Sequence, residues 1–152
     1  MAEIRHFCSF TVDGMLVGID VRQVREVIRS RTMTPVPLAD PAVAGLINLR
    51  GEIVTGIDLR TRLGLARRPD GAEPMHVVIR LGDGAVSLMV DEIGEVIEAA
   101  DVLLERPPET LAGPVRRMIA GVCQLPGRLL VVLDIDSAFA FGAAQPSQTG
   151  EE

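Results

Sequence analysis

The chain of 152 residues contains no lysine, tryptophan or tyrosine, and its aromatic side chains, histidine aside, are four phenylalanines. Without lysine it lacks the phosphate-binding residue of P-loop nucleotide sites and the nucleophile of Schiff-base enzymes. It also lacks the lysine that a phosphorylatable receiver domain needs. With few aromatic rings for base stacking and a net charge of −6, the chain is a poor candidate for binding nucleic acid.

Long apolar runs are also missing. No stretch reaches the length of a membrane-spanning helix, and the first residues show no apolar core of a signal peptide. We therefore expect a cytoplasmic protein without direct membrane insertion. Cys8 and Cys123 each lie in an apolar run, which favours buried reduced thiols over a redox or metal role.

The residues that catalysis requires are sparse. The sequence contains no HExxH, CxxC or GxSxG motif. His6 and Cys8 would share one face of a strand, but two ligands are too few for a closed metal site. Asp91 and Glu92 lie outside any calcium-binding loop, and we interpret them as helix-capping or solvated surface residues. We predict no catalytic residue, no metal site and no cofactor, and hence a protein that is not an enzyme.

Charge is unevenly distributed along the chain. Residues 1–69 carry ten arginines against seven acids, a net charge of +3, whereas residues 70–113 carry ten acids against two arginines, a net charge of −8. This asymmetry could orient a partner protein, or it could belong to an ordinary solvated surface. The sequence alone leaves both interpretations open.

An internal repeat is the most informative feature. Residues 44–59 align without a gap with residues 120–135, and Ala, Gly, Leu, Gly and Asp recur at matching places. Each copy predicts a strand, a tight turn, a second strand and an Asp that caps a short helix, here Asp58 and Asp134. The segments that precede the two copies, residues 7–28 and 77–97, also resemble each other, but more weakly.

Glycines punctuate the predicted hairpins. Asp13-Gly14 and Asp83-Gly84 separate apolar runs, and turns of this kind need the positive φ that glycine accepts. The predicted structural turn residues are Gly14, Gly51, Gly84 and Gly127. Within residues 21–29, Val21, Val24 and Ile28 recur at helical spacing, so we expect a turn of helix that runs into a strand near Glu26.

The repeat predicts a mainly β fold with short helices. Each half offers four or five short strands, the pattern of a small β-barrel, and two such halves would pack about a pseudo-twofold axis with a groove between them. The halves cover about residues 5–65 and 75–141 of one domain, 5–141, and an exchange of strands between them is left open. Residues 66–74 form a polar linker, and residues 142–152 a disordered tail.

The two copies differ at the tip of the second hairpin. Arg50 stands where the other copy has Pro126, and a tight turn does not require arginine. Its five-donor fork on a rigid hairpin would suit a carboxylate on a partner, but an ordinary exposed arginine is an equally good interpretation.

Several segments resemble the CheW-like domain. Residues 45–54, Gly-Leu-Ile-Asn-Leu-Arg-Gly-Glu-Ile-Val, followed by Ile-Asp-Leu-Arg at residues 57–60, are similar to the signature of that family. Residues 18–28 and 89–97 match further segments of it, so the resemblance covers about residues 5–141. It implies two SH3-like β-barrels related by a pseudo-twofold axis.

The resemblance also implies a role. Members of the family are adaptors that bind the regulatory domain of a CheA-type histidine kinase and the cytoplasmic tip of chemoreceptors. By analogy, Arg50 and Glu26 occupy positions linked to partner binding, and Val24 and Val27 would contribute to a groove for a receptor helix. Kinase docking would use the hairpin from Leu46 to Ile53, including Asn48 and Leu49.

Two alternatives to flagellar chemotaxis stay open. The first is an adaptor of a chemosensory-like pathway that controls another output. The second is a barrel that binds a small molecule, which an internal pocket of ligand size would favour and a filled core would oppose.

Overall fold

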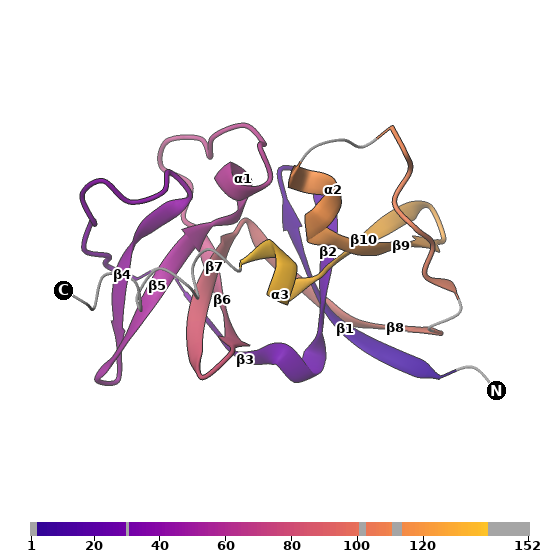
Figure 1. Cartoon of the computed structure of the whole chain (residues 1–152), viewed down its shortest axis with the longest axis horizontal. Coiled ribbons are helices and arrows are strands. Elements are labelled where there is room, and N and C mark those ends of the chain that lie inside the picture. The colour runs from indigo at the N-terminus through magenta and orange to yellow at the C-terminus, as the bar shows by residue number, and fades with distance from the viewer. Residues whose placement is uncertain (1–2, 30, 101–102, 111–113, 140–152) are drawn as a thin grey trace.

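The predicted mainly β fold is confirmed. The computed structural model describes residues 3–29, 31–100, 103–110 and 114–139 (Figure 1), so the predicted disordered tail, 142–152, lies outside the described residues. The strands are β1 (Ile4–Val12), β2 (Met15–Asp20), β3 (Val24–Ile28), β4 (Val43–Leu49), β5 (Glu52–Asp58), β6 (Met75–Leu81), β7 (Gly84–Val90), β8 (Glu92–Ala100), β9 (Ile119–Leu125) and β10 (Arg128–Leu133). The helical segments are η1 (Val21–Gln23), α1 (Leu59–Arg62), α2 (Pro114–Met118) and α3 (Ile135–Ala138).

The described strands form two five-stranded sheets, which we name sheet A, in the order β8-β1-β2-β10-β9, and sheet B, in the order β3-β6-β7-β5-β4. If each strand is exchanged for its counterpart in the other half of the sequence, β1 for β6, β2 for β7 and so on, the strand order of sheet A becomes that of sheet B. Each sheet joins the first hairpin of one half of the sequence to three strands of the other half. The boundary between the two halves of the sequence therefore does not coincide with the boundary between the two sheets. The boundaries of the predicted domain, 5–141, stay a prediction.

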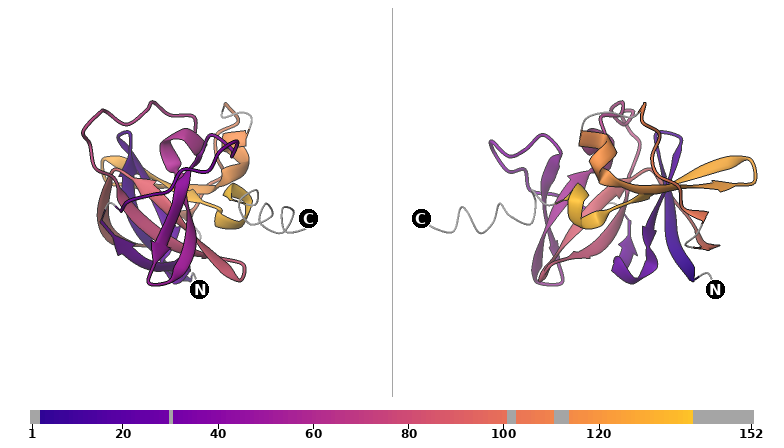
Figure 2. Two further views of the ribbon diagram at one scale, coloured as in Figure 1. Left: turned by 90° about the vertical axis from the view of Figure 1, so that its left-hand side faces the viewer. Right: turned by 45° about the vertical axis from the view of Figure 1, so that its right-hand side comes forward.

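Two parallel pairings bring the sequence halves together within the sheets. β10 lies beside β2 in sheet A, and β5 lies beside β7 in sheet B. Within the described residues the chain passes between the sheets after β2, through η1, and again at Asp91, between β7 and β8. Figures 1 and 2 show the sheets side by side, with α3 at their junction.

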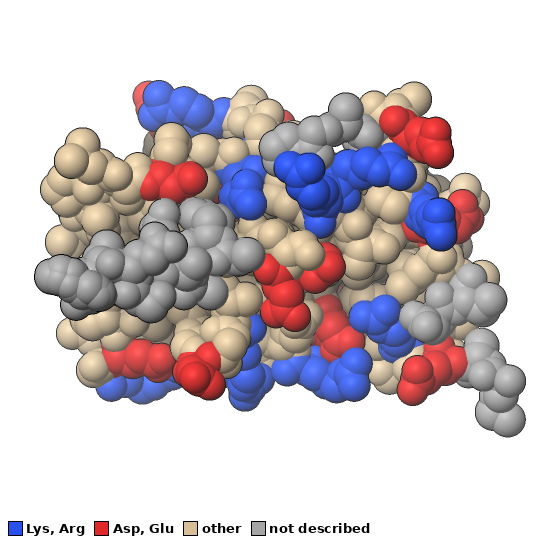
Figure 3. All heavy atoms as spheres, in the orientation of Figure 1, with Lys and Arg blue, Asp and Glu red and all other residues tan. Residues whose placement is uncertain are grey.

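The strand exchange also distributes charge. Strands from the basic first part of the sequence enter both sheets, as do strands from the acidic middle part. On the face shown in Figure 3, arginine and acidic side chains are interspersed. The charge asymmetry along the sequence therefore does not divide this face into a positive half and a negative half.

The turns follow the prediction with one correction. Gly14, Gly51 and Gly127 have φ values of +80°, +90° and +77°. Gly84 was predicted to be such a residue, but it begins β7, and the residue with positive φ is Gly82, at +61°. Gly82-Asp83 is thus the two-residue loop, with Gly at its first central position as a type II′ turn requires.

The short helical segments begin where capping residues stand. Asp58 accepts a hydrogen bond from the backbone N–H of Arg60, at 3.1 Å, and Asp134 one from that of Ser137, at 3.3 Å. The turn of helix expected near Val21 is η1, and the strand that follows begins at Val24, two residues before the predicted point.

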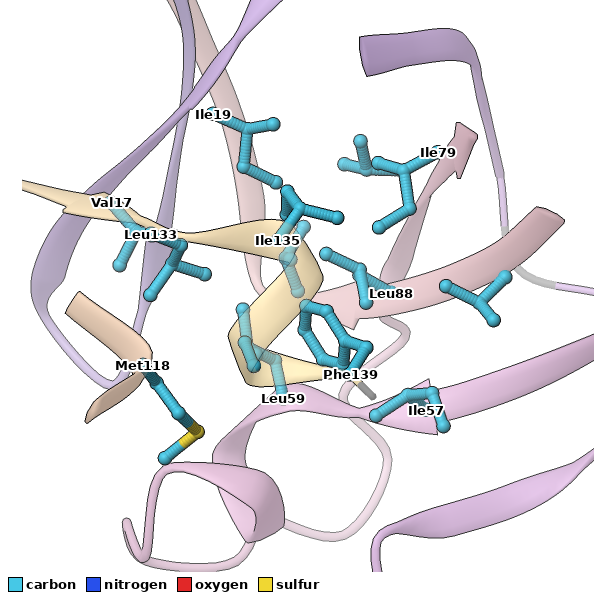
Figure 4. Packing of buried hydrophobic residues seen from close by; sticks show 14 of the residues in the cluster. Val17, Ile19, Ile57, Leu59, Ile79, Leu88, Met118, Leu133, Ile135 and Phe139 are labelled. Carbon is cyan, nitrogen blue, oxygen red and sulfur yellow. The ribbon is translucent and has the colours of Figure 1, made fainter. Parts of the chain in front are cut away.

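One large core is shared by the two sheets. It includes Phe10 and Ile19 from sheet A and Ile57 and Leu88 from sheet B, all fully buried. Phe139, just after α3, inserts its ring beside Leu88 and Ile57 (Figure 4). Cys8 and Cys123 are buried free thiols, and burial raises the pKa of Cys8. Because this core contains side chains of both sheets, they pack as one unit.

Candidate functional site

The β4–β5 turn carries Arg50, whose guanidinium forms an ion pair with Glu26 of β3. These elements belong to the two opposite edges of sheet B, so the pair links the two edges of the sheet. Beside it, Arg25 lies 2.9 Å from Glu52 and 3.7 Å from Glu26. The four residues form an alternating network of charges at one end of the barrel.

The electrostatics of this network favour the charged forms. The hydrogen bond from Arg50 lowers the pKa of Glu26, and the same bond raises the pKa of Arg50. Since Arg50 remains largely exposed, solvent screens the attraction and the pair adds little to stability. Its main effect is to orient two charged groups at the surface.

The backbone at Arg50 is strained. Its φ is +53°, and with Gly51 at +90° both central residues of the turn are left-handed, as in a type I′ turn. Asn or Gly would adopt the first position more readily than Arg. The side chain of Asn48 accepts a hydrogen bond from the backbone N–H of Gly51, at 2.9 Å, and so supports the turn. The turn therefore displays Arg50 in a backbone conformation that other residues adopt more readily.

The outward face of the β4–β5 hairpin carries three of the residues predicted for docking. Asn48 pairs with Ile53 across the hairpin, and Leu46 pairs with Thr55 on the same face. The side chain of Ile53 is 62% exposed, which makes it the main apolar feature of this face. Leu46 is half-buried.

Leu49 was predicted to contact a partner, and the structure corrects this. Its side chain is 1% exposed and packs with Val54 and Val78. Adjacent residues of a strand point to opposite faces, so Asn48 and Leu49 could not both face a partner. This alternation was visible in the sequence and could have excluded Leu49 from the surface predicted to contact a partner.

β3 brings the predicted receptor-binding residues to the same end of the barrel. Val27 is 39% exposed, whereas Val24 is half-buried and packs against the shared core. Of the two valines, Val27 therefore offers more apolar surface to a partner. Glu26, between them, is the partner of Arg50.

Residues 6–141 match the family model of the CheW-like domain. The chain belongs to the CheW-like family. It is 31% identical over 136 residues to chemotaxis protein CheW of Treponema pallidum. This alignment covers 87% of this chain and 80% of that protein. It is 32% identical over 128 residues to chemotaxis protein CheW of Bacillus subtilis, with coverage of 84% and 82%.

The fold of a solved structure agrees with this assignment. The scaffolding protein TtCheW of Thermoanaerobacter tengcongensis superposes with a TM-score of 0.81, at 24% sequence identity, over 91% of this chain and 93% of that one. The likeness supports the two SH3-like β domains expected for a CheW-like chain.

A second charge cluster of this CheW-like domain was not anticipated. Arg60 of α1 is 8% exposed and donates to both carboxylate oxygens of Asp91, at 3.0 and 2.7 Å. It also donates to the backbone carbonyls of Ala66 and Arg67, each at 3.1 Å. Asp91 was interpreted as a capping or solvated surface residue, and this was wrong.

The environment of Asp91 keeps it ionised. Burial alone would raise the pKa of its carboxyl, but hydrogen bonds from Arg60 and from the backbone N–H of Asp13, with the charge of Arg68, lower it overall. The cluster joins α1, the linker, the β1–β2 turn and the crossing between the sheets. No local motif in the sequence could reveal it, since its members are far apart along the chain.

His76 and Ser87 form a buried pair that the sequence also did not predict. Nδ1 of His76 lies 2.9 Å from Oγ of Ser87, and neither residue is accessible to solvent. Burial, reinforced by the charges of Arg68 and Arg31, lowers the pKa of His76. A substrate could not reach either side chain, so the pair has no catalytic geometry.

Within the described ranges, no group of three or more His, Cys, Asp or Glu residues is placed to hold a metal ion. In the same part of the chain, no helix is long and apolar enough to cross a membrane.

Proposed function

We propose that this chain is a non-catalytic chemotaxis adaptor that couples the cytoplasmic tips of chemoreceptors to a CheA-type histidine kinase. The observation that carries the proposal is the Arg50–Glu26 pair on a strained and supported turn. The relatives named CheW and the scaffolding protein of similar fold support it. The protein would act in the cytoplasm, at receptor arrays that it joins through its partners.

The kinase regulatory domain would dock on the outward face of the β4–β5 hairpin. Ile53 offers an exposed apolar anchor, with half-buried Leu46 beside it. Apolar anchors surrounded by polar groups carry most of the energy of protein interfaces. Arg50 and Glu52 at the end of the hairpin would fix the register of the partner.

The receptor tip would use the β3 side of the same barrel end. Val27 supplies exposed apolar surface on the face of β3 opposite to Glu26. An amphipathic helix could place its apolar face on Val27.

The filled core favours an adaptor over a small-molecule sensor. Between the two sheets, the space shown in Figure 4 is occupied by side chains such as Phe139, Ile135 and Leu88. A ligand would have to displace them. The choice between flagellar chemotaxis and another chemosensory pathway depends on the partner kinase.

The deciding experiment is calorimetric titration of the chain into the isolated regulatory domain of the cognate kinase. We expect saturable one-to-one binding that Arg50→Glu weakens. Arg128→Glu is the matched control, because Arg128 is an exposed arginine beside the corresponding turn of sheet A. Absence of wild-type binding at high micromolar concentration would overturn the proposal.

A further inference from the structure

Leu38 is an exposed apolar residue in an unfavourable backbone conformation. Its side chain has a relative exposure of 105%, and its φ is +62°. Glycine and asparagine adopt this left-handed region readily, whereas leucine does so rarely. Both features are unfavourable for the free protein, so packing within the chain does not explain the choice of leucine here.

Hydrogen bonds on both sides of Leu38 hold its loop in place. On one side, the backbone of Thr34 exchanges two hydrogen bonds with that of Leu46 in β4, at 2.9 and 2.8 Å. On the other, the carboxylate of Asp40 accepts from the N–H of Ala42, at 2.9 Å, and its carbonyl accepts from the N–H of Val43, at 2.8 Å. Pro37, directly before Leu38, stiffens the loop because its ring fixes its own φ.

The loop continues the surface proposed for docking. It leaves β3, is bonded to β4 at Leu46, and projects beside β4 at the outer end of sheet B (Figures 1 and 2). Leu46 lies on the outward face of the hairpin that also exposes Ile53. A partner that covers this face would therefore lie next to the loop.

We propose that Leu38 is an anchor residue that inserts into an apolar pocket of the kinase regulatory domain when that domain docks on the β4–β5 hairpin. The inference rests on the proposed function and adds a contact to it. A leucine on a loop already fixed by hydrogen bonds loses little conformational entropy on binding. Burial of its side chain removes the apolar exposure of the free state.

Two substitutions separate binding from stability. Leu38→Asn removes the apolar side chain and suits the left-handed backbone, so we expect the melting temperature to rise by about 2 °C. Calorimetry with the regulatory domain should show an affinity lower by about tenfold. Leu38→Ala should give the same loss of affinity with an unchanged melting temperature. Leu103→Asn, at another exposed leucine, is the matched control and should leave the affinity unchanged.

The outcomes distinguish the inference from the proposed function. If Arg50→Glu weakens binding and neither Leu38 variant does, the inference fails and the proposed function stands. If Leu103→Asn weakens binding as much as Leu38→Asn, the effect is not specific and the inference also fails. If the wild-type chain does not bind the regulatory domain, both fail.

Discussion

Arg60 holds both carboxylate oxygens of Asp91, a residue 31 positions further along the chain. Asp91 stands between β7 of sheet B and β8 of sheet A. The pair therefore fixes one of the described crossings between the sheets, and its bidentate geometry is the strong form of an arginine–carboxylate contact.

Loss of Arg60 should destabilise the fold. Arg60→Ala leaves the mostly buried carboxylate of Asp91 without its main partner, and we expect the free energy of unfolding to fall by about 3 kcal/mol. Urea denaturation followed by circular dichroism measures this change. Arg128→Ala, which breaks an exposed ion pair with Glu95, should cost less than about 0.5 kcal/mol. Equal costs for the two variants would contradict the structural role of Arg60.

Reversal of charge at Arg50 should affect binding and leave the fold intact. Arg50→Glu places a second carboxylate against Glu26 on an exposed turn, so we expect a native circular dichroism spectrum and an affinity for the regulatory domain lower by about tenfold or more. A chain that no longer folds would show that Arg50 is structural. An unchanged affinity would remove it from the docking site.

A β-branched residue at Gly51 should destabilise the β4–β5 hairpin. A β-carbon there meets no atom within 4 Å, so the cost of Gly51→Val comes from its φ of +90° and should be about 2 kcal/mol. Gly84 is the matched control, since its β-carbon would also point into open space but its φ is not left-handed. Thermal denaturation should separate the two variants, and equal stabilities would argue against the turn geometry.

Stability should fall as the pH drops below about 6.5. Burial lowers the pKa of His76 in the folded state, so the unfolded state binds a proton more readily. The contribution of neutral His76 is complete above the unfolded pKa and decreases below it. Carboxylates with lowered pKa values, such as Asp91, lose their contribution only at more acidic pH.

The comparison of His76→Leu with a control variant isolates this effect. Urea denaturation at pH 7.5 and pH 5.5 should show a smaller difference in stability for His76→Leu than for the wild type. Leu103→Asn, at an exposed leucine without a titratable group, should retain the wild-type difference. Identical differences in all three proteins would show that His76 does not control the pH dependence.

Local features of the fold were readable in the sequence. Asp13-Gly14, Pro126-Gly127 and the capping residues Asp58 and Asp134 act over two or three residues, so their effect is visible in a short segment. The prediction of a turn at Asp83-Gly84 was wrong by one residue, because Gly82 comes just before this pair. The turn places Gly82 at its first central position. Two glycines separated by one residue leave the exact turn residue ambiguous.

The candidate site was only partly predictable. Arg50 could be singled out because it departs from its repeat, and the resemblance to the CheW-like family pointed to Glu26. That the two side chains meet depends on how sheet B curls until β3 approaches the β4–β5 turn. No motif in the sequence pointed to Leu38, because its exposure and left-handed backbone arise only from the path of the folded loop.

The sequence by itself determined the repeat, the hairpins, the short caps and the mainly β class, because backbone preferences and side-chain alternation act between near neighbours. Only the tertiary structure decided which hairpin joins which sheet. The parallel pairs β2–β10 and β5–β7 bring together strands from different halves of the chain, and that choice depends on the burial of one shared core. The same long-range packing set Arg60 against Asp91 and Arg50 against Glu26.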